Sequence, residues 1–142
     1  MKVRVSALLL CVPLMTACTY PANSTKISPG MWWQNRKAEQ LRDAGRCRDA
    51  IPIWEKLVAV LRKERGYESI AVASMLHALG SCKITTSELA DAERLFNGSL
   101  QIKLLLLGSE HQEVGMILHQ LAFVQHERGD LVKAEKLDPA LL

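Results

Sequence analysis

The sequence lacks the patterns that mark most enzymes, β-sheet proteins and nucleic-acid-binding proteins. No stretch of useful length alternates apolar and polar residues, which argues against a β-sheet fold. The nucleophile elbow, the glycine-rich phosphate loop and the His-Glu-x-x-His zinc motif are all absent. We therefore expect no enzymatic activity and no cofactor. The 142 residues include 18 basic and 15 acidic side chains, a balance that gives no indication of nucleic-acid binding.

The sequence also has no apolar run long enough to cross a bilayer as a helix at its N-terminus. Residues 5–15 are apolar and follow the basic residues Lys2 and Arg4. The run ends in Leu-Met-Thr-Ala-Cys at residues 14–18, which resembles the lipobox of bacterial lipoproteins. The resemblance implies that residues 1–17 are a signal peptide and that Cys18 becomes the first, lipidated residue.

Two destinations follow from this N-terminus. Thr19 is not acidic, and in lipoproteins of this kind that implies the outer membrane, with the protein facing the periplasm. The alternative is an ordinary secretory signal that is cut near Ala17 and leaves a soluble periplasmic protein. Residues 18–30 contain prolines and polar residues without helical periodicity, so we expect a flexible tether after the lipidated cysteine.

What the sequence does contain is an internal repeat. Alanine recurs every 42 residues, at Ala50, Ala92 and Ala134, each time within a similar phrase. When residues 66–95 are shifted by 42 they overlie residues 108–137, and ten of the thirty pairs are identical. A fixed period of this size is typical of helical repeat arrays, which commonly bind other proteins.

The repeat predicts an all-α domain over residues 31–142. Turn signals separate segments with helical periodicity, and the segments form antiparallel pairs that make about two and a half to three repeats of a short solenoid. We expect helices over residues 31–44, 47–64, 69–84, 87–106, 111–128 and 131–138.

The third unit resembles a known family. Residues 107–122 follow the pattern Leu-Gly-x-x-His-x-x-Val-x-x-x-Leu-x-x-Leu-Ala, and residues 129–135 the pattern Gly-Asp-Leu-x-x-Ala-Glu. Together they resemble a tetratricopeptide repeat of the 42-residue kinesin-light-chain type. The middle unit matches less fully, with Ser87 in place of the turn glycine. The resemblance implies a right-handed solenoid in which the first helix of each pair lines a concave groove for a peptide or partner helix.

The resemblance also assigns the residues that line this groove. They are Trp32, Asn35, Arg36 and Glu39 in the first unit, Ser74, His77, Ala78 and Ser81 in the second, and Met116, His119, Gln120 and Phe123 in the third. Met116 and Phe123 have the apolar, adaptable side chains of binding anchors. The alternative for Phe123 is packing against the adjoining helix. Trp32 and Trp33 are adjacent and cannot both face inward, so we expect one of them in the core.

Two cysteines remain once Cys11 leaves with the signal and Cys18 is lipidated. If residues 47–64 and 69–84 form an antiparallel hairpin, positions that sum to about 129 lie side by side, and Cys47 and Cys82 satisfy this sum. In an oxidising periplasm such a pair can form a disulfide. The alternative is two semi-buried free thiols that serve as small apolar residues.

The histidines suggest a weaker hypothesis. His77, His119 and His126 would approach one another on stacked helices, and three such ligands would make a metal site. A polar groove is the ordinary explanation, and we expect no metal. His111 belongs to the repeat motif and is expected to cap a helix.

The last unit is shorter than the repeat requires, because Pro139 ends its second helix early. We therefore expect Leu118, Leu121 and Val124 to be only partly covered, so that either the chain is truncated or a partner covers this face.

These observations lead to one function and two alternatives. We expect a lipid-anchored periplasmic adaptor that binds another envelope protein through the concave groove. One alternative is a structural envelope protein that self-assembles into homo-oligomers through the uncapped C-terminal face. The other is a small metal-binding or enzyme-accessory protein that uses the three histidines.

Overall fold

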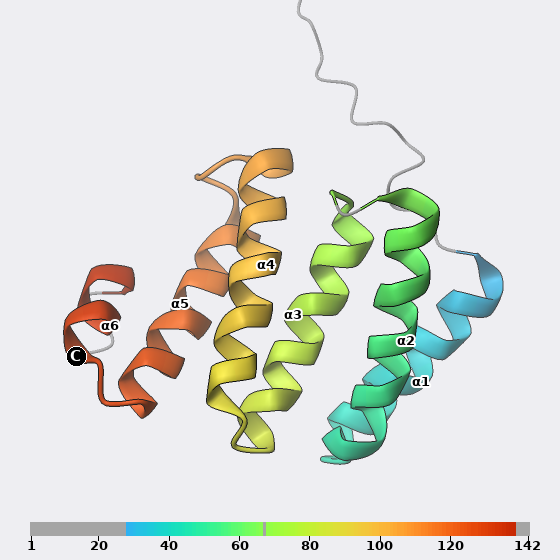
Figure 1. Cartoon of the computed structure of the whole chain (residues 1–142), viewed down its shortest axis with the longest axis horizontal. Coiled ribbons are helices and arrows are strands. Elements are labelled where there is room, and N and C mark those ends of the chain that lie inside the picture. The colour runs from blue at the N-terminus through green and yellow to red at the C-terminus, as the bar shows by residue number, and fades with distance from the viewer. Residues whose placement is uncertain (1–27, 67, 139–142) are drawn as a thin grey trace, which may run out of the picture.

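The computed structural model describes residues 28–66 and 68–138, and all regular structure in these residues is helical (Figure 1). Consecutive helices run antiparallel and pack against one another, so they form three pairs of which the last is short. The predicted all-α solenoid of antiparallel helix pairs is confirmed. The helices are α1 (Pro29–Asp43), α2 (Cys47–Arg65), α3 (Ile70–Thr85), α4 (Leu89–Leu107), α5 (Gln112–Glu127) and α6 (Leu131–Leu137).

The predicted signal peptide and the lipidated Cys18 lie outside the described residues. The end of the predicted tether is described, and it is helical. α1 begins at Pro29, and the hydroxyl of Ser28 accepts a hydrogen bond from the backbone nitrogen of Met31 at 3.4 Å. Proline is favourable at the first helical position, since the N–H that it lacks would have no partner there. The first helix therefore begins two residues earlier than predicted.

A residue in the left-handed region precedes the second helix of every pair. Gly45 has φ +72°, Ser87 has φ +65° and Gly129 has φ +81°. Among the described residues Ser87 is the only non-glycine residue with positive φ. It stands where the other two units have glycine, and it adopts the same conformation at a steric cost that glycine avoids. The turn geometry is thus set by the repeat rather than by the local residue.

The core is built from the residues that repeat every 42 positions. Ala50, Ala92 and Ala134 are all fully buried. Trp54 and Phe96 occupy equivalent positions in the first two units, and both are completely buried. In α2 and in α4 a small buried residue is thus followed one turn later by a large one, which suits close helix packing.

Neither of the adjacent tryptophans lies in the core, so the prediction that one of them is buried is wrong. The exposed fraction is 48% for Trp32 and 67% for Trp33, and the two rings meet edge to face with centroids 4.6 Å apart. The reason is that α1 is the outermost helix and buries only Ala38 completely. The buried tryptophan of this region is Trp54 of α2, which lies in the same core cluster as Ala38.

The expected exposure at the C-terminal unit is also wrong in part. Leu121 and Val124 are buried in a cluster with Phe96, because α5 packs against both α4 and α6. The large apolar residues that stay exposed in this unit include Leu131 and Val132 of α6, with exposed fractions of 50% and 64%. The apolar face is therefore one helix further along than predicted.

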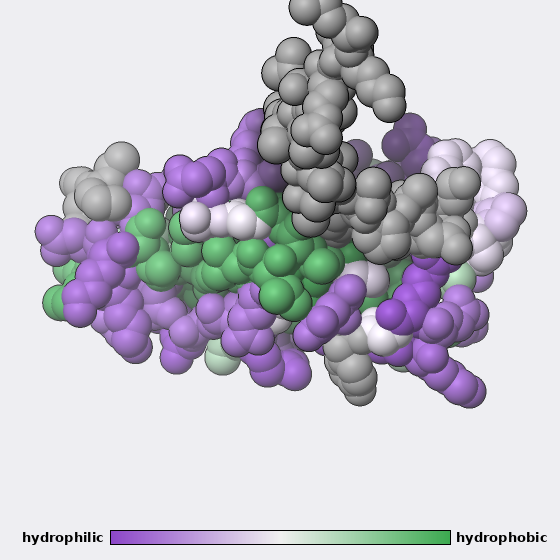
Figure 2. Space-filling view, turned by 90° about the horizontal axis from the view of Figure 1, so that it is seen from above, coloured by the Kyte–Doolittle hydropathy of each residue, from purple (hydrophilic) through white to green (hydrophobic). Residues whose placement is uncertain are grey.

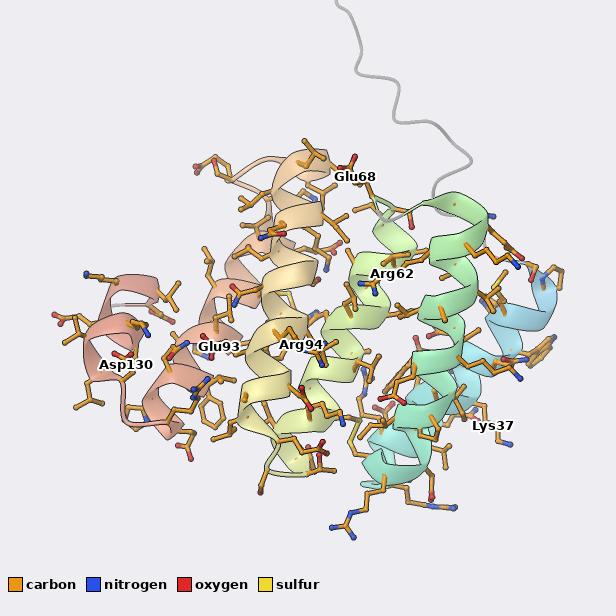
Figure 3. The ribbon with its side chains drawn as sticks, in the orientation of Figure 1. Lys37, Arg62, Glu68, Glu93, Arg94 and Asp130 are labelled. Carbon is orange, nitrogen blue, oxygen red and sulfur yellow. A yellow bond between two sulfur atoms is a disulfide. The ribbon has the colours of Figure 1, made fainter. Side chains whose placement is uncertain are left out.

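A polar contact fixes the third pair to the second. Glu93, labelled in Figure 3, extends from α4 and accepts a hydrogen bond from the side-chain amide of the buried Gln125 on α5. Its other carboxylate oxygen pairs with the guanidinium of Arg128. Glu93 thus bonds one side chain in the last turn of α5 and one directly after it. These bonds help to fix the position of α5 along α4.

No helix in the described part of the chain is both long enough and apolar enough to cross a membrane.

Candidate binding groove

A hollow of about 310 Å³ lies between α1 and α3, the first helices of the first two pairs. Its lining is mostly polar and comes from both helices: Asn35, Glu39, Arg42, Ile70, Ala71, Ser74, Met75, His77, Ala78 and Ser81. Six of these residues are among those that the family resemblance assigns to the groove, namely Asn35, Glu39, Ser74, His77, Ala78 and Ser81. The structure thus brings the predicted residues of the first two units together on one surface.

Two other predicted residues of α1 do not line this hollow. Trp32 lies one turn before Asn35 and is half exposed. Arg36 is exposed, and its guanidinium lies 3.6 Å from the carboxylate of Glu39. Arg36 therefore lies outside the hollow, beside one of the residues that line it.

The predicted residues of α5 lie one repeat further along and do not line this hollow either. Met116, His119, Gln120 and Phe123 occupy the repeat positions that Ser74, His77, Ala78 and Ser81 occupy on α3. The exposed fraction is 50% for Met116 and 36% for Phe123, and Phe123 belongs to neither buried cluster. Phe123 is therefore one of the exposed large apolar side chains in the described part of the chain.

Asn35 has a structural contact beneath the groove. Its side-chain oxygen accepts a 2.8 Å hydrogen bond from the indole nitrogen of Trp54, and its amide nitrogen donates to Glu39 at 2.9 Å. Arg42 also contacts Trp54, with its guanidinium carbon 5.9 Å from the ring centroid. The α1 wall of the groove is thus held in place by a buried tryptophan of α2.

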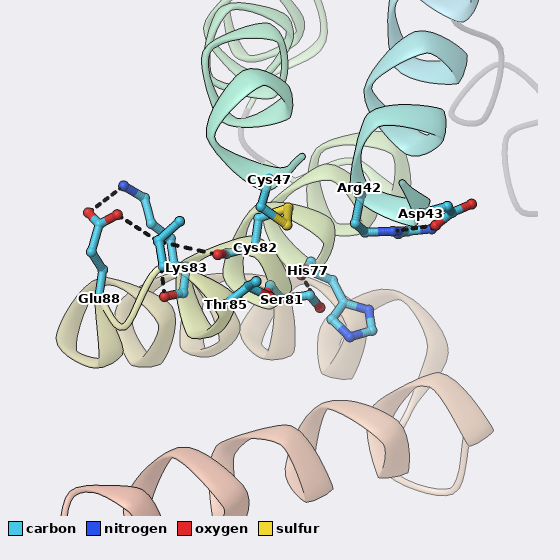
Figure 4. Close-up of a disulfide and its surroundings, with 10 residues drawn as sticks. Arg42, Asp43, Cys47, His77, Ser81, Cys82, Lys83, Thr85 and Glu88 are labelled. Atoms are coloured by element: carbon cyan, nitrogen blue, oxygen red, sulfur yellow. Dashed lines mark hydrogen bonds and ion pairs between the residues drawn. A yellow bond between two sulfur atoms is a disulfide. The ribbon is translucent and has the colours of Figure 1, made fainter. Parts of the chain in front are cut away.

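His77 is half-buried in the α3 wall. Its ring meets Phe96 edge to face at 5.6 Å, and its backbone carbonyl accepts a hydrogen bond from the Ser81 hydroxyl at 3.1 Å (Figure 4). Burial lowers the pKa of His77 below its ordinary value of 6.5, and the positive charge of Lys103 lowers it further. His77 therefore presents a neutral ring to the groove at neutral pH.

An ion pair that was not predicted from the sequence lies behind His77, and its lysine is buried. Lys103 extends from α4 and is 2% exposed, and its ammonium lies 2.7 Å from a carboxylate oxygen of Glu113 on α5. The hydrogen bond from Lys103 lowers the pKa of the Glu113 carboxyl. A signal was present, because Lys103 is the only charged residue in the apolar run 102–107.

The three histidines of the metal hypothesis do not converge. The ring of His119 lies 2.6 Å from the carboxylate of Asp138, and the ring of His126 lies 3.6 Å from Glu127. Within residues 28–66 and 68–138, no three His, Cys, Asp or Glu side chains gather closely enough to hold a metal ion. The metal-binding hypothesis therefore has no site in this part of the chain. His111, by contrast, caps α5 as predicted, by accepting a hydrogen bond from the Glu113 nitrogen.

Cys47 and Cys82 form a disulfide bond with their Cα atoms 5.1 Å apart (Figure 4). It is the pair that the hairpin geometry predicts, and both side chains are buried. The bond joins the start of α2 to the end of α3. It thus links the first helix pair covalently to α3, which forms the wall of the groove opposite α1.

A second hollow, which the sequence analysis did not anticipate, lies between α2 and α4. It measures about 290 Å³ and is lined by α2, α3 and α4, with Leu76 and Leu79 of α3 among its apolar residues. Arg62 and Arg94, labelled in Figure 3, belong to its charged rim. This hollow involves the second helices of the first two pairs, whereas the predicted groove involves the first helices.

The comparisons with known proteins agree with this geometry. The family model described as tetratricopeptide repeat matches residues 31–104 and again residues 71–138. Two crystal structures of a putative kinesin light chain from Podosopora anserina, with nearly identical TPR-like repeats, align at 22% identity with a TM-score of 0.67. Each alignment covers 76% of this chain and 51% of the other.

The crystal structure of BtubC (BKLC) from P. vanneervenii aligns at 19% identity with a TM-score of 0.70, over 78% of this chain and 44% of the other. The chain thus spans about half the length of these solved structures. At such identities the similarity shows the fold alone. No curated protein matches the sequence.

Proposed function

Because the chain belongs to the tetratricopeptide repeat family, we propose that it is an adaptor of the bacterial cell envelope. Tetratricopeptide repeats mediate protein–protein interactions, and the role assigned here is to hold another envelope protein on the concave side of the solenoid. The observation that supports this most is the hollow between α1 and α3, which gathers six residues from the predicted groove positions of two units. The role requires no catalytic step and no cofactor.

The chemistry of the surface suggests how a partner segment is held. The hollow between α1 and α3 offers amide, carboxylate, hydroxyl and neutral imidazole groups, which suit the polar side chains or backbone of a peptide. Met116 and Phe123 on α5 are exposed apolar side chains at the equivalent repeat positions. A segment that crosses α1, α3 and α5 would therefore place polar groups in the hollow and an apolar side chain on α5.

We further propose that Cys18 is acylated and anchors the adaptor to the outer membrane, on its periplasmic side. The lipobox-like residues 14–18 support this assignment. The Cys47–Cys82 disulfide is consistent with it, because disulfides persist in an oxidising compartment such as the periplasm.

The groove is tested by crosslinked pull-down from cell envelopes. Wild-type chain is compared with the double variant Met116→Ala, Phe123→Ala and with Val132→Ala, a control on α6 whose parent side chain is 64% exposed. We expect a specific partner that is recovered with wild type and the control and lost with the double variant. Recovery of the same partner with all three chains would disprove the groove assignment.

The anchor is tested separately, by metabolic labelling with radioactive palmitate. We expect label in the wild-type chain and none in Cys18→Ser, which should also leave the membrane fraction. An unlabelled wild-type chain that is nevertheless cut near Ala17 would favour the soluble periplasmic alternative.

Self-assembly is the second candidate function, and the exposure of Leu131 and Val132 on α6 favours it. Sedimentation at increasing protein concentration separates the two candidates. An adaptor is expected to remain monomeric at micromolar concentration. An oligomer that dissociates in the variant Val132→Glu would instead support self-assembly through α6.

A further inference from the structure

The last turn of α4 ends in an exposed apolar surface that neither the groove nor the core explains. It consists of four leucines, residues 104–107. The exposed fraction is 41% for Leu104 and 63% for Leu105, and the other two leucines are half-buried. Figure 2 looks down on this end of the helices and shows apolar atoms gathered there between polar flanks. We refer to residues 104–107 as the leucine turn.

The first repeat shows that the architecture does not require leucine here. Residues 62–65 of α2 lie 42 positions earlier and read Arg-Lys-Glu-Arg. α2 and α4 have the same length of 19 residues, and each ends at a glycine with positive φ, Gly66 or Gly108. A helix C-terminus favours cationic side chains, which the last turn of α2 has and that of α4 lacks. The leucine turn is therefore a departure from the repeat, on a surface open to solvent.

The leucine turn lies at the end of the solenoid where the described chain begins. Because α1 and α4 run in opposite directions, the start of α1 at Ser28 and the end of α4 lie at the same, upper end in Figure 1. Nine residues lie between Cys18 and Ser28, so the chain that joins them reaches at most about 35 Å. α4 itself is about 28 Å long. An anchor at Cys18, which is part of the proposed function, therefore holds this end nearer to the bilayer than the other end.

The exposed area of the leucine turn is too small for a specific protein interface but sufficient for insertion into a bilayer surface. A specific protein interface buries more than about 1,000 Å² in total, and two partly exposed leucines supply only a small fraction of that. Insertion into the boundary between headgroups and acyl chains needs only a few apolar side chains, provided that polar groups stay at headgroup depth. Arg62 and Glu68 supply such groups, since they line the hollow of about 450 Å³ that Leu105 also borders (Figure 3).

We propose that the leucine turn inserts into the surface of the bilayer to which the chain is anchored. Lys63 of α2 and the acidic residues Glu64 and Glu110 are exposed at this end of the helices, so the charges there are mixed and apolar contact drives the insertion. The helices then stand steeply on the membrane, and the groove between α1 and α3 opens sideways along the bilayer. The solenoid is thus held by two points, the acylated Cys18 and the leucine turn.

The test uses the chain that begins at Cys18, which retains every described residue. Its thiol is coupled to a maleimide phospholipid in vesicles of phosphatidylethanolamine with a minor share of phosphatidylglycerol; Cys47 and Cys82 do not react because they are bonded. The photocrosslinking residue benzoylphenylalanine replaces either Leu105 or Val132, which are equally exposed at 63% and 64%. Lipid adducts are then measured by mass spectrometry.

We expect several-fold more lipid adduct from position 105 than from position 132. Equal yields at the two positions, or adducts of position 105 with a second protein chain in place of lipid, would overturn the inference. The same crosslinker in intact cells distinguishes a lipid contact from a protein contact at position 105. A protein adduct without any lipid adduct would contradict the insertion of the leucine turn.

A variant of the chain gives an independent readout. The double substitution Leu104→Arg, Leu105→Lys introduces the residues that α2 has at these positions, so we expect the melting temperature to change little. Vesicles should slow amide hydrogen exchange at the end of α4 in the wild type and leave it unchanged in the variant. Equal slowing in both chains would count against insertion.

The chemical coupling separates this inference from the proposed function. If palmitate labelling shows that cells do not acylate Cys18, the anchor assignment fails, yet the coupled chain still reports on the leucine turn. If cells acylate Cys18 and position 105 forms no lipid adduct, the anchor stands and the insertion of the leucine turn is wrong.

Discussion

The indole nitrogen of Trp54 donates a 2.8 Å hydrogen bond to the side-chain oxygen of Asn35, which joins α2 to α1 directly beneath the groove. Trp54 is completely buried, and no solvent reaches its N–H. Asn35 also lines the groove, so one side chain both satisfies the core and shapes the binding surface. A change at this position is expected to affect folding before it affects binding.

The variant Asn35→Ala should therefore be less stable than the wild type. Removing the acceptor leaves the buried indole N–H unsatisfied, which costs about 1–3 kcal/mol. Urea denaturation measures the free energy of unfolding, and Ser74→Ala, an exposed residue of the same groove, is the control. Asn35→Asp keeps an acceptor oxygen and should recover part of the loss. Equal stability of Asn35→Ala and the control would show that the hydrogen bond contributes nothing.

The variant Gly80→Ala should also be destabilised, by overpacking between α3 and α4. A Cβ atom on Gly80 would lie 2.9 Å from Cε1 of Phe96 and 3.0 Å from two further ring atoms. Forcing a buried ring to move typically costs about 1–3 kcal/mol. Thermal unfolding monitored by circular dichroism measures the effect.

Gly115 provides the matched control for Gly80. It lies within α5, and a Cβ there would meet no atom within 4 Å. Gly115→Ala should therefore gain about 0.5–1 kcal/mol from helix propensity. A loss in both variants, or a gain in both, would contradict the assigned role of the Gly80–Phe96 contact. Phe96→Leu in the Gly80→Ala background should relieve part of the strain.

Reduction of the Cys47–Cys82 bond should lower the stability of the folded chain. The bond closes a loop between residues 35 positions apart, and such crosslinks typically contribute about 2–4 kcal/mol. The measurement is denaturant unfolding with and without a reductant. Cys82→Ala has no bond to lose and should not respond to the reductant. A wild-type midpoint that stays the same after complete reduction would rule out a stabilising role.

The stability should also depend on pH through His77. Burial and the charge of Lys103 lower the pKa of His77 in the folded state, so at pH values below about 6.5 the unfolded chain binds more protons than the folded chain. The stabilisation that the lowered pKa of His77 contributes is present above about pH 6.5. It is lost as the pH falls from there toward the lowered pKa. The lowered pKa of Glu113 acts in the same direction, but only below its ordinary value of 4.5.

His77→Gln should therefore flatten the pH dependence of unfolding just below about pH 6.5. Urea midpoints at several pH values measure this slope for both chains. An identical decline in wild type and variant would show that another group is responsible.

The period of 42 residues was sufficient to predict much of the fold. Each unit repeats the same packing, and the alanine that recurs at positions 50, 92 and 134 is buried in all three units. The disulfide was predicted from the expected hairpin of residues 47–64 and 69–84, since the length of a helix hairpin determines which positions lie side by side. The α1 and α3 residues of the groove were found because they repeat the positions of the family motif.

The features that were missed lie where the repeat breaks down. Trp32 and Trp33 belong to an outermost helix that has a neighbour on one side only. α1 therefore has more apolar residues than it can bury. Lys103 is buried because a single acidic partner, Glu113, follows ten residues later on the next helix. Periodicity locates faces of helices and does not identify such pairs between helices.

The disulfide crosses the boundary between two repeats, because Cys47 belongs to the first helix pair and Cys82 to the second. In a solenoid each pair contacts only its neighbours, so pairs detach one at a time from the ends. The crosslink closes that route for the first pair, whereas α5 and α6 are held to α4 by noncovalent packing alone. A partner that wedges between α3 and α5 can therefore displace the third pair while the other two move as one covalently joined block. The wall that bears Asn35 is joined to this block through the Trp54 hydrogen bond, whereas the wall that bears Phe123 has no covalent crosslink to it among the described residues.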